Sequence, residues 1–477
     1  MSKGNDTIAE SGWLERRFRV QERGSTLARE LVGAAAIFLT LSYILFVQPV
    51  VMGMALPDGT SPEAAAAFQS SVLTALCLAS AFACFVMAFL ANFPVALAPA
   101  MGHNFFFSLV VVKMMGFTWQ QALAANLVAG LVFLALSLAG MWLPKFDPRA
   151  MLFDAMPKGL INAIAVGIGL LIALVGFEYA GIVVPTPGTY IGLGFGKVPT
   201  PVLATAFVGL LVFGVLWARG VVGAPLWAIL ASAVVGGLLH VVSLPKGIVA
   251  TPTLSATALQ LDFTGLCHLP LKAVVIAIAT FLFLVIFDTV GTLAAVCSRA
   301  GLISQQGRFD AGTRGAFVAD AGGTVAGALL GTSTITSYVA SLAGIQTGAR
   351  TGLAALGVGV LFLVAMFFAP LLAPVAGAYV YKMGDTTLFL YPCLAPVLIG
   401  IGALMLWCVK EIAWDDATEA LPAFLCIVAM PLTLSITDGI AFGLIGYVVL
   451  KTCTGRWREI NVFISVCAAL LAVRYLL

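Results

Sequence analysis

The sequence predicts an all-α protein that crosses a membrane many times. Hydrophobic residues make up 61% of the 477 residues and charged residues only 9%, whereas a typical soluble domain contains about 25% charged residues. The mean hydropathy is +1.08. Apolar stretches recur along the whole chain, and two of them contain prolines or glycines at membrane depth. We therefore expect 14 transmembrane segments, two of them broken.

An apolar stretch of about 20 residues is long enough to cross the hydrocarbon core as a helix. In chain order the expected spans cover residues 29–52, 66–91, 94–113, 119–142, 158–176, 201–217, 223–242, 270–296, 313–329, 331–346, 351–374, 391–409, 419–436 and 438–452. A last apolar stretch at 459–476 would place the C-terminus outside if it crossed fully. We interpret it as interfacial, or as a sign that the pair before it spans incompletely.

The basic residues lie in alternate loops, and this placement predicts the orientation. Arg17 and four further arginines precede the first span, while Arg149, Arg308 and Arg350 follow the fourth, eighth and tenth spans. Loops rich in Lys and Arg stay in the cytoplasm, so we expect a multi-pass inner-membrane protein with a cytoplasmic N-terminus. The first thirty residues are polar and charged, so we expect no cleavable signal peptide. The net charge of +3 gives no indication of a nucleic-acid partner.

The third and tenth spans are the two that we expect to be broken. The segment "NFPVALAPAMGHNFFF" (Asn92–Phe107) carries two prolines, and proline cannot continue a helix. The segment "GALLGTSTITSYVASLAG" (Gly327–Gly344) carries several glycines and a Thr/Ser run. Each should begin as a short extended piece and become helical, at Met101 and at about Ile335. Seven spans separate the two, which predicts an inverted repeat of seven plus seven spans with both breaks facing one polar cavity.

The eighth span contains one acidic residue in the apolar stretch "FLFLVIFDTVGTLAAV" (residues 281–296), namely Asp288. A charged group at the bilayer centre costs roughly 2.5–3.5 kcal/mol on insertion scales. Asp288 should therefore face a protein interior or a water-filled path, and the inverted repeat places it beside both broken segments. The alternative is a structural acid that binds backbone groups. We interpret Asp320, on the ninth span, as structural or as part of coupling.

Several motifs lie in the expected order along the chain. They are "YILFVQP" at Tyr43–Pro49, "ALAPAMGHNFFF" at Ala96–Phe107, "FDTVGTL" at Phe287–Leu293, "RTG" at Arg350–Gly352 and "WDDATEALPAFLCIVAMPLTLSITDGIAFG" at Trp414–Gly443. Together they resemble the AzgA-like purine permeases, the hypoxanthine/guanine/adenine branch of the nucleobase:cation symporters. The resemblance extends from about Glu22 to Glu459 and implies a proton-coupled purine carrier with a uracil-permease-like fold.

The resemblance also implies a division into domains. A core (transport) domain would comprise residues 29–145 and 270–374, and a gate domain residues 146–269 and 375–455. A cytoplasmic N-terminal segment, 1–28, and a C-terminal apolar segment, 456–477, would flank them. The substrate would lie between the ends of the third and tenth spans, and transport would follow alternating access.

The family's site residues transfer to this chain only in part. Asp288 matches the aspartate of the "FDTxGTL" motif, Asn104 matches the asparagine of "GMGLN", and Thr332 and Ser333 belong to a matching "GTS" turn. The resemblance therefore implies proton coupling at Asp288 or His103. It also implies substrate contacts at Asp288, Asn104, His103, Thr332, Ser333, Thr334, Gln48 and the position of Ala340. The alternatives are that His103 is only a satisfied polar group and that the Thr/Ser run bonds freed backbone groups.

Four positions depart from the family pattern. Ala340 stands where the motif "TSYIES" has an acid that binds purine N–H groups, and Val285 replaces a second acid. His103 stands in place of leucine and Gln48 in place of asparagine. Two carboxylates are thus missing and an imidazole is gained. The substrate is therefore a purine nucleobase or related planar heterocycle, with another small, anionic solute as the alternative.

An enzymatic function is not indicated, because no HExxH, Walker loop or nucleophile elbow lies in a suitable context. We accordingly predict no catalytic residue, no cofactor and no metal site. The expected partners are a nucleobase-like substrate, a proton and the lipid bilayer. The oligomeric state is left open, with a homodimer as one arrangement.

Overall fold

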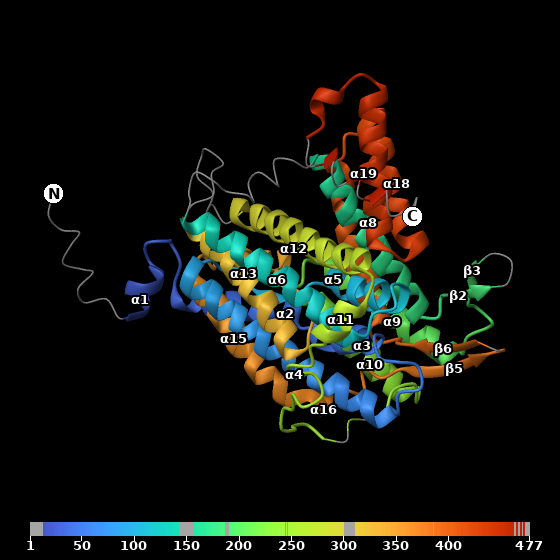
Figure 1. The fold of residues 1–477 in the computed structure, drawn as a ribbon. Coiled ribbons are helices and arrows are strands. Elements are labelled where there is room, and N and C mark those ends of the chain that lie inside the picture. Colours follow the sequence, from blue (N-terminus) through green and yellow to red (C-terminus); the bar gives the residue numbers. More distant parts are fainter. Residues whose placement is uncertain are drawn as a thin grey trace.

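The computed structural model describes residues 13–142, 157–186, 190–243, 245, 247–299, 311–384, 386–461, 464–465, 468–469 and 471–472. The protein is mostly helical (Figure 1). Within these residues, eight helical segments are long and apolar enough to cross a membrane. They coincide with the expected spans 1, 2, 4, 5, 6, 8, 11 and 14. The predicted loop residues Arg149 and Arg308 and half of the stretch 459–476 lie outside the described residues.

The first part of the chain contains the first broken segment. Its elements are α1 (Trp13–Phe18), α2 (Leu27–Leu41), α3 (Ile44–Gly53), α4 (Pro62–Val86), the π-helix η1 (Met87–Ala91), β1 (Leu97–Pro99), α5 (Met101–Phe105), the π-helix η2 (Phe106–Met114) and α6 (Trp119–Trp142). Thr26 and Ser61 cap α2 and α4 by accepting hydrogen bonds from backbone N–H groups, as expected for N-cap residues.

The next part forms a bundle with two surface strands. Its elements are α8 (Lys158–Tyr179), β2 (Val183–Thr186), β3 (Tyr190–Leu193), α9 (Thr200–Ala218), α10 (Ala224–Leu238) and α11 (Phe263–His268). The second broken segment follows between long helices. These elements are α12 (Leu271–Arg299), α13 (Ala311–Leu330), β4 (Ile335–Ser337), the 3-10 helix η3 (Val339–Ser341), α14 (Leu342–Gln346), α15 (Gly352–Ala365), η4 (Met366–Phe368) and α16 (Ala369–Leu372).

The last part adds a hairpin and three helices. Its elements are β5 (Tyr379–Met383), β6 (Thr386–Leu390), α17 (Ala395–Met405), η5 (Leu406–Glu411), α18 (Ala417–Thr433), α19 (Ile436–Cys453) and η6 (Trp457–Glu459). The prediction of an all-α protein was therefore wrong in detail, because β2–β3 and β5–β6 form antiparallel hairpins. Residues 379–383 alternate between partly buried and exposed side chains, a period that favours strand over helix.

The helices pack in two groups. In one group α15 packs on α2 and α4, α13 packs on α4 and α6, and α12 packs on α6. In the other group α8 packs on α17 and α18, α18 packs on α19, and α9 packs on α10 and α17. Figure 1 shows α8, α18 and α19 standing together beside the group that contains α6, α12 and α13.

The two broken segments meet inside the first group. β1 and β4 pair antiparallel, Leu97 with Ser337, Ala98 with Thr336 and Pro99 with Ile335, and the central pair joins residues 238 positions apart in the sequence. All six residues are buried. The pairing supplies hydrogen bonds to backbone N–H and C=O groups that are buried and do not belong to a helix.

The segment before the first span is bonded to the rest of the fold. Phe18 is buried, and its carbonyl accepts a hydrogen bond from Asn92 Nδ2 at 2.9 Å. Arg23 Nη1 donates to the carbonyls of Asn92 (2.6 Å) and Arg350 (3.2 Å). The buried carboxylate of Glu30 accepts from Arg350 N at 2.8 Å. The N-terminal segment and the turn before α15 therefore lie at the same end of the molecule.

Candidate functional site

We call the β1–β4 pair the crossing, and each of its strands leads into a half-helix. β1 is followed by α5 at Met101, as predicted. The prediction for the second segment was wrong, because its helical part begins at Val339 and not at about Ile335. Ile335 and Thr336 are β-branched and favour an extended backbone, and they are paired with β1. Since the strands are antiparallel, the chain leaves the crossing in opposite directions.

Backbone hydrogen bonds continue the crossing beyond the two strands. Ala100 N donates to the carbonyl of Thr334 at 3.1 Å, and Tyr338 N donates to the carbonyl of Ala96 at 3.0 Å. The hydroxyl of Tyr338 donates to the carbonyl of Pro99 at 2.6 Å. Little backbone freedom is left where the half-helices begin.

Two helices of the first group hold the second broken segment. Asp320, buried on α13, accepts hydrogen bonds from Thr336 Oγ1 at 3.1 Å and from Ser337 Oγ at 2.9 Å. Thr334 Oγ1 donates to Asn126 Oδ1 on α6 at 2.7 Å. The hydroxyl of Thr334, which we expected to contact substrate, thus donates its hydrogen to a side chain on a neighbouring helix. The interpretation of Asp320 as a structural acid agrees with these bonds.

Four of the predicted site residues bond to one another. Gln48 Nε2 on α3 donates to Thr332 Oγ1 at 2.9 Å and to Ser333 Oγ at 3.1 Å. Ser333 Oγ donates to Asn104 Oδ1, and Asn104 Nδ2 donates to Gln48 Oε1. All four side chains are fully buried, at 0% exposure. The structure therefore brings together residues from the first, third and tenth expected spans.

His103 and Asp288 form a second pair beside this cluster. His103 Nδ1 on α5 lies 4.0 Å from Asp288 Oδ2 on α12. The two side chains differ in accessibility, since 41% of the Asp288 side chain is exposed and only 4% of the His103 side chain. His103 Nε2 is buried and finds no hydrogen-bond partner among the described residues. Asp288 is therefore a carboxylate held at the junction of the broken segments with oxygen surface still available.

The pair lies where the two helix groups meet. A Cβ at Gly102, the residue before His103, would lie 3.2 Å from the side chain of Ile168 on α8. α5 therefore approaches the second group closely, and α12 contacts both α5 and η3. A solute held at Asp288 would thus be at the boundary between the groups.

The departures at positions 285 and 340 have different surroundings. Val285 is 1% exposed and packs in the apolar core, so its side chain occupies the space of the missing acid with apolar contacts. Ala340 is partly buried on η3, which contacts α12. No acid therefore accompanies Asp288 at either position.

The sequence reasoning missed three residues that shape the site. They are Asn126, Thr289 and Tyr338. Thr289 Oγ1 lies 3.2 Å from Thr336 Oγ1 and links α12 to β4. Asn126 is a fully buried amide within the apolar α6. A single amide in an apolar stretch is visible in the sequence, and a buried amide needs a hydrogen-bond partner. Tyr338 lies next to the Thr/Ser run, and only the fold shows that its hydroxyl reaches β1.

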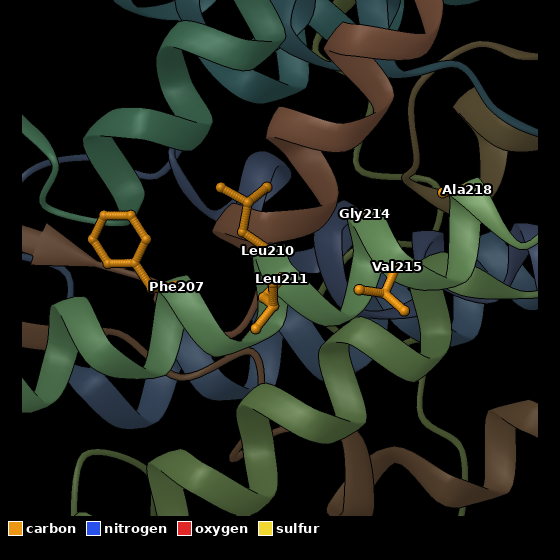
Figure 2. A pocket seen from close by; sticks show the side chains of 6 residues that line it. All are labelled: Phe207, Leu210, Leu211, Gly214, Val215 and Ala218. Atoms are coloured by element: carbon orange, nitrogen blue, oxygen red, sulfur yellow. The ribbon is translucent and has the colours of Figure 1, made fainter.

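An apolar surface depression lies away from these residues. An open depression of about 470 Å³ is lined by Phe207, Leu210, Leu211, Gly214, Val215 and Ala218, all on α9. Figure 2 shows these residues following the exposed side of one helix. The lining is wholly apolar, as expected for a surface that faces lipid chains. It lacks the polar groups that would orient a solute.

The comparisons with known proteins identify the family. The model of the Xan_ur_permease family, described as Permease family, matches residues 28–442. The chain belongs to this family. This permease is therefore a multi-pass membrane transporter and not an enzyme, as the sequence predicted.

Two relatives extend the match to nearly the whole chain. The permease is 40% identical over 449 residues to the guanine/hypoxanthine permease PbuG of Bacillus subtilis strain 168, with 93% of this chain and 95% of that protein covered. It is 36% identical over 468 residues to the adenine permease AdeQ of Escherichia coli strain K12, with 98% and 97% covered. These matches confirm the resemblance to the AzgA-like purine permeases.

The fold of the permease is also found in a solved structure. The transmembrane domain of a cyanobacterium bicarbonate transporter, BicA, is similar with a TM-score of 0.57 at 17% identity. The likeness covers 88% of this chain and 97% of that domain. At this identity it shows the fold alone, a mostly helical polytopic transporter fold.

Proposed function

We propose that this permease carries a purine nucleobase, or a closely related planar heterocycle, across the inner membrane. The observation that carries the proposal is the exposed carboxylate of Asp288 at the junction of the two broken segments, 4.0 Å from His103. A purine presents N–H donors along its edges, and a carboxylate accepts them strongly. The relatives PbuG and AdeQ, named as guanine/hypoxanthine and adenine permeases, support the same substrate class.

Transport proceeds by alternating access between two domains. Residues 29–145 and 270–374 form the core domain, and residues 146–269 and 375–455 form the gate domain. The separate packing of the two helix groups supports this division. The 14 expected spans then form an inverted repeat of seven plus seven, with the breaks in the third and tenth. The antiparallel pairing of β1 with β4 supports opposite insertion of the two halves.

Asp288 and His103 are the residues that we assign to the substrate and to the proton. Asp288 accepts hydrogen bonds from the base, and a proton on this carboxylate competes with them. His103 contributes a buried imidazole whose Nε2 has no partner among the described residues, and a ring nitrogen of histidine can donate or accept a proton. Coupling to protons is thus a property of this pair. The cytoplasmic N-terminus follows from the loop charges.

One observation favours a second candidate, a small anionic solute. Neither of the acids that the family motifs imply beside Asp288 is present, since positions 285 and 340 carry Val and Ala, and half-helix N-termini attract anions. The same geometry then requires Asp288 to be protonated when the anion binds. This candidate differs from the first in predicting tighter binding at lower pH.

A ligand screen of the purified permease tests both candidates. Binding to the folded state stabilises it by RT ln(1 + L/Kd), where L is the free ligand concentration, and so raises the unfolding temperature. Adenine, guanine and hypoxanthine should raise it, and pyrimidines and small carboxylates should not. Stabilisation by a carboxylate alone would refute the purine proposal and support the anionic candidate. Uptake of the stabilising compound into proteoliposomes against its gradient would then distinguish a carrier from a channel.

A further inference from the structure

We infer that Gln48, Asn104 and Ser333 form a closed ring of hydrogen bonds that clamps the two broken segments, and that these three are positioning residues and not substrate ligands. The inference deepens the proposed function and rests on it for the transport measurement. It revises the substrate contacts that the family motifs imply for these three positions.

The hydrogen bonds close on themselves. Ser333 donates to Asn104, Asn104 donates to Gln48, and Gln48 donates back to Ser333. Each member therefore gives one hydrogen bond to the ring and accepts one from it. The second N–H of Gln48 is used on Thr332 Oγ1. The hydroxyl hydrogen of Ser333, the oxygen of Gln48 and both of its N–H groups are thus engaged within the protein.

The ring joins three segments that are far apart in the sequence. Gln48 lies on α3, Asn104 on α5, and Ser333 in the turn between α13 and β4. The backbone of that turn is constrained, because Gly331 adopts φ +96° and a Cβ there would lie 2.4 Å from Thr257. The ring therefore fixes the start of one half-helix against the approach to the other.

Burial separates the ring from the exposed acid. The three ring residues are 0% exposed, whereas 41% of the Asp288 side chain is exposed. A buried polar ring in a low-dielectric environment is favourable only while every member is paired. A solute that accepted a hydrogen bond from Gln48 or Ser333 would have to break it, because both N–H groups of Gln48 and the hydroxyl hydrogen of Ser333 are already donated. Asp288 can be reached without doing so.

The test is a set of full-length variants measured for uptake of radiolabelled adenine and hypoxanthine in proteoliposomes. Ser333→Ala and Gln48→Leu each open the ring. We expect each to lower the maximal rate by about 10- to 100-fold, because a misplacement of about 1 Å can cost roughly 100-fold in a positioned site. The half-saturating concentration should stay within about threefold of the wild-type value. The double variant should be no slower than the slower single variant, since one break already opens the ring.

A buried hydroxyl outside the ring provides the matched control. Thr205 is 0% exposed on α9, and its hydroxyl bonds only the carbonyl of Pro201 in the same helix at 2.8 Å. Thr205→Val should leave both kinetic parameters unchanged. If the ring variants instead raise the half-saturating concentration more than they lower the rate, or if their losses multiply in the double variant, the residues are ligands and the inference is wrong.

Thermal unfolding without any solute keeps the inference testable apart from the substrate. The shifts of the unfolding temperature caused by Ser333→Ala and Gln48→Leu should be clearly non-additive. The triple variant Gln48→Leu/Asn104→Leu/Ser333→Ala removes every member of the ring and leaves only Thr332 Oγ1 without its bond from Gln48, so it should unfold at a higher temperature than either single variant while uptake stays low. Additive shifts would overturn the clamp. Failure of the wild-type protein to bind any purine would overturn the proposed function and leave this cycle unaffected.

Discussion

Replacement of Asp288 by asparagine is the sharpest test of the proposed transport cycle. Asp288 Oδ2 lies 4.0 Å from His103 Nδ1, beyond hydrogen-bond distance, so the imidazole does not occupy this oxygen. With 41% of the side chain exposed, the carboxylate is free to accept from a bound base. Asparagine keeps the shape and one acceptor but loses the charge and the titrating proton.

The expected loss follows from one charge-assisted hydrogen bond. Such a bond contributes about 1.5–3 kcal/mol, and about 1.4 kcal/mol corresponds to a tenfold change in affinity. Asp288→Asn should therefore weaken purine binding by about 10- to 150-fold and abolish accumulation driven by a pH gradient. The assay is purine uptake into proteoliposomes with and without an imposed gradient, together with competition binding.

The matched control is Asp58→Asn. The Asp58 side chain is 97% exposed and bonds Lys113 Nζ at 2.7 Å. This variant should accumulate substrate like the wild type. Full accumulation by Asp288→Asn would refute our reasoning, because Asp288 would then be neither the proton carrier nor an essential ligand.

Three further predictions concern other parts of the permease. His103→Leu should change the pH optimum or the affinity of uptake while transport stays measurable, since Asp288 remains; complete loss of uptake would make His103 indispensable. Asn92→Ala removes a side chain that bonds two backbone groups and should lower stability by about 1–2 kcal/mol, read as a lower unfolding temperature; an unchanged temperature would contradict the role of Asn92. Hydrogen bonds from the side chain and backbone of Thr418 lower the pKa of Asp416 from its ordinary value of 3.8 to about 2. Its stabilising contribution is therefore present above about pH 4 and lost as the pH falls toward 2, and Asp416→Asn should remove that part of the acid-induced unfolding profile.

The break in the third span could be predicted from the sequence because a single residue type decides it. Proline disfavours the interior of a helix, and two prolines lie close together in this segment, so an extended piece before Met101 was expected. The second break was harder to place. Its glycines and hydroxyl residues permit both helix and strand, and the pairing with β1 settles the matter for Ile335. Pairing between residues 97–99 and 335–337 is a tertiary contact that local pattern does not contain.

The ring of Gln48, Asn104 and Ser333 shows the same limit within the site. Each residue was recognised as polar at membrane depth, and a polar residue in that setting needs a partner. Which partner it takes depends on how three distant segments fold together. The sequence therefore indicated the set of residues but not the difference between a buried ring and an exposed acid.

The contacts of the N-terminal segment with the turn before α15 can form only late in synthesis. The hydrogen bond from Arg23 to the carbonyl of Arg350 joins residues 327 positions apart. Ribosomes add about 5–20 residues per second, so roughly 16–65 s pass between the synthesis of the two partners. During that interval the segment that contains Arg23 lacks its hydrogen bond to Arg350. The contacts of the N-terminal segment can therefore be completed only after the tenth expected span has been synthesised.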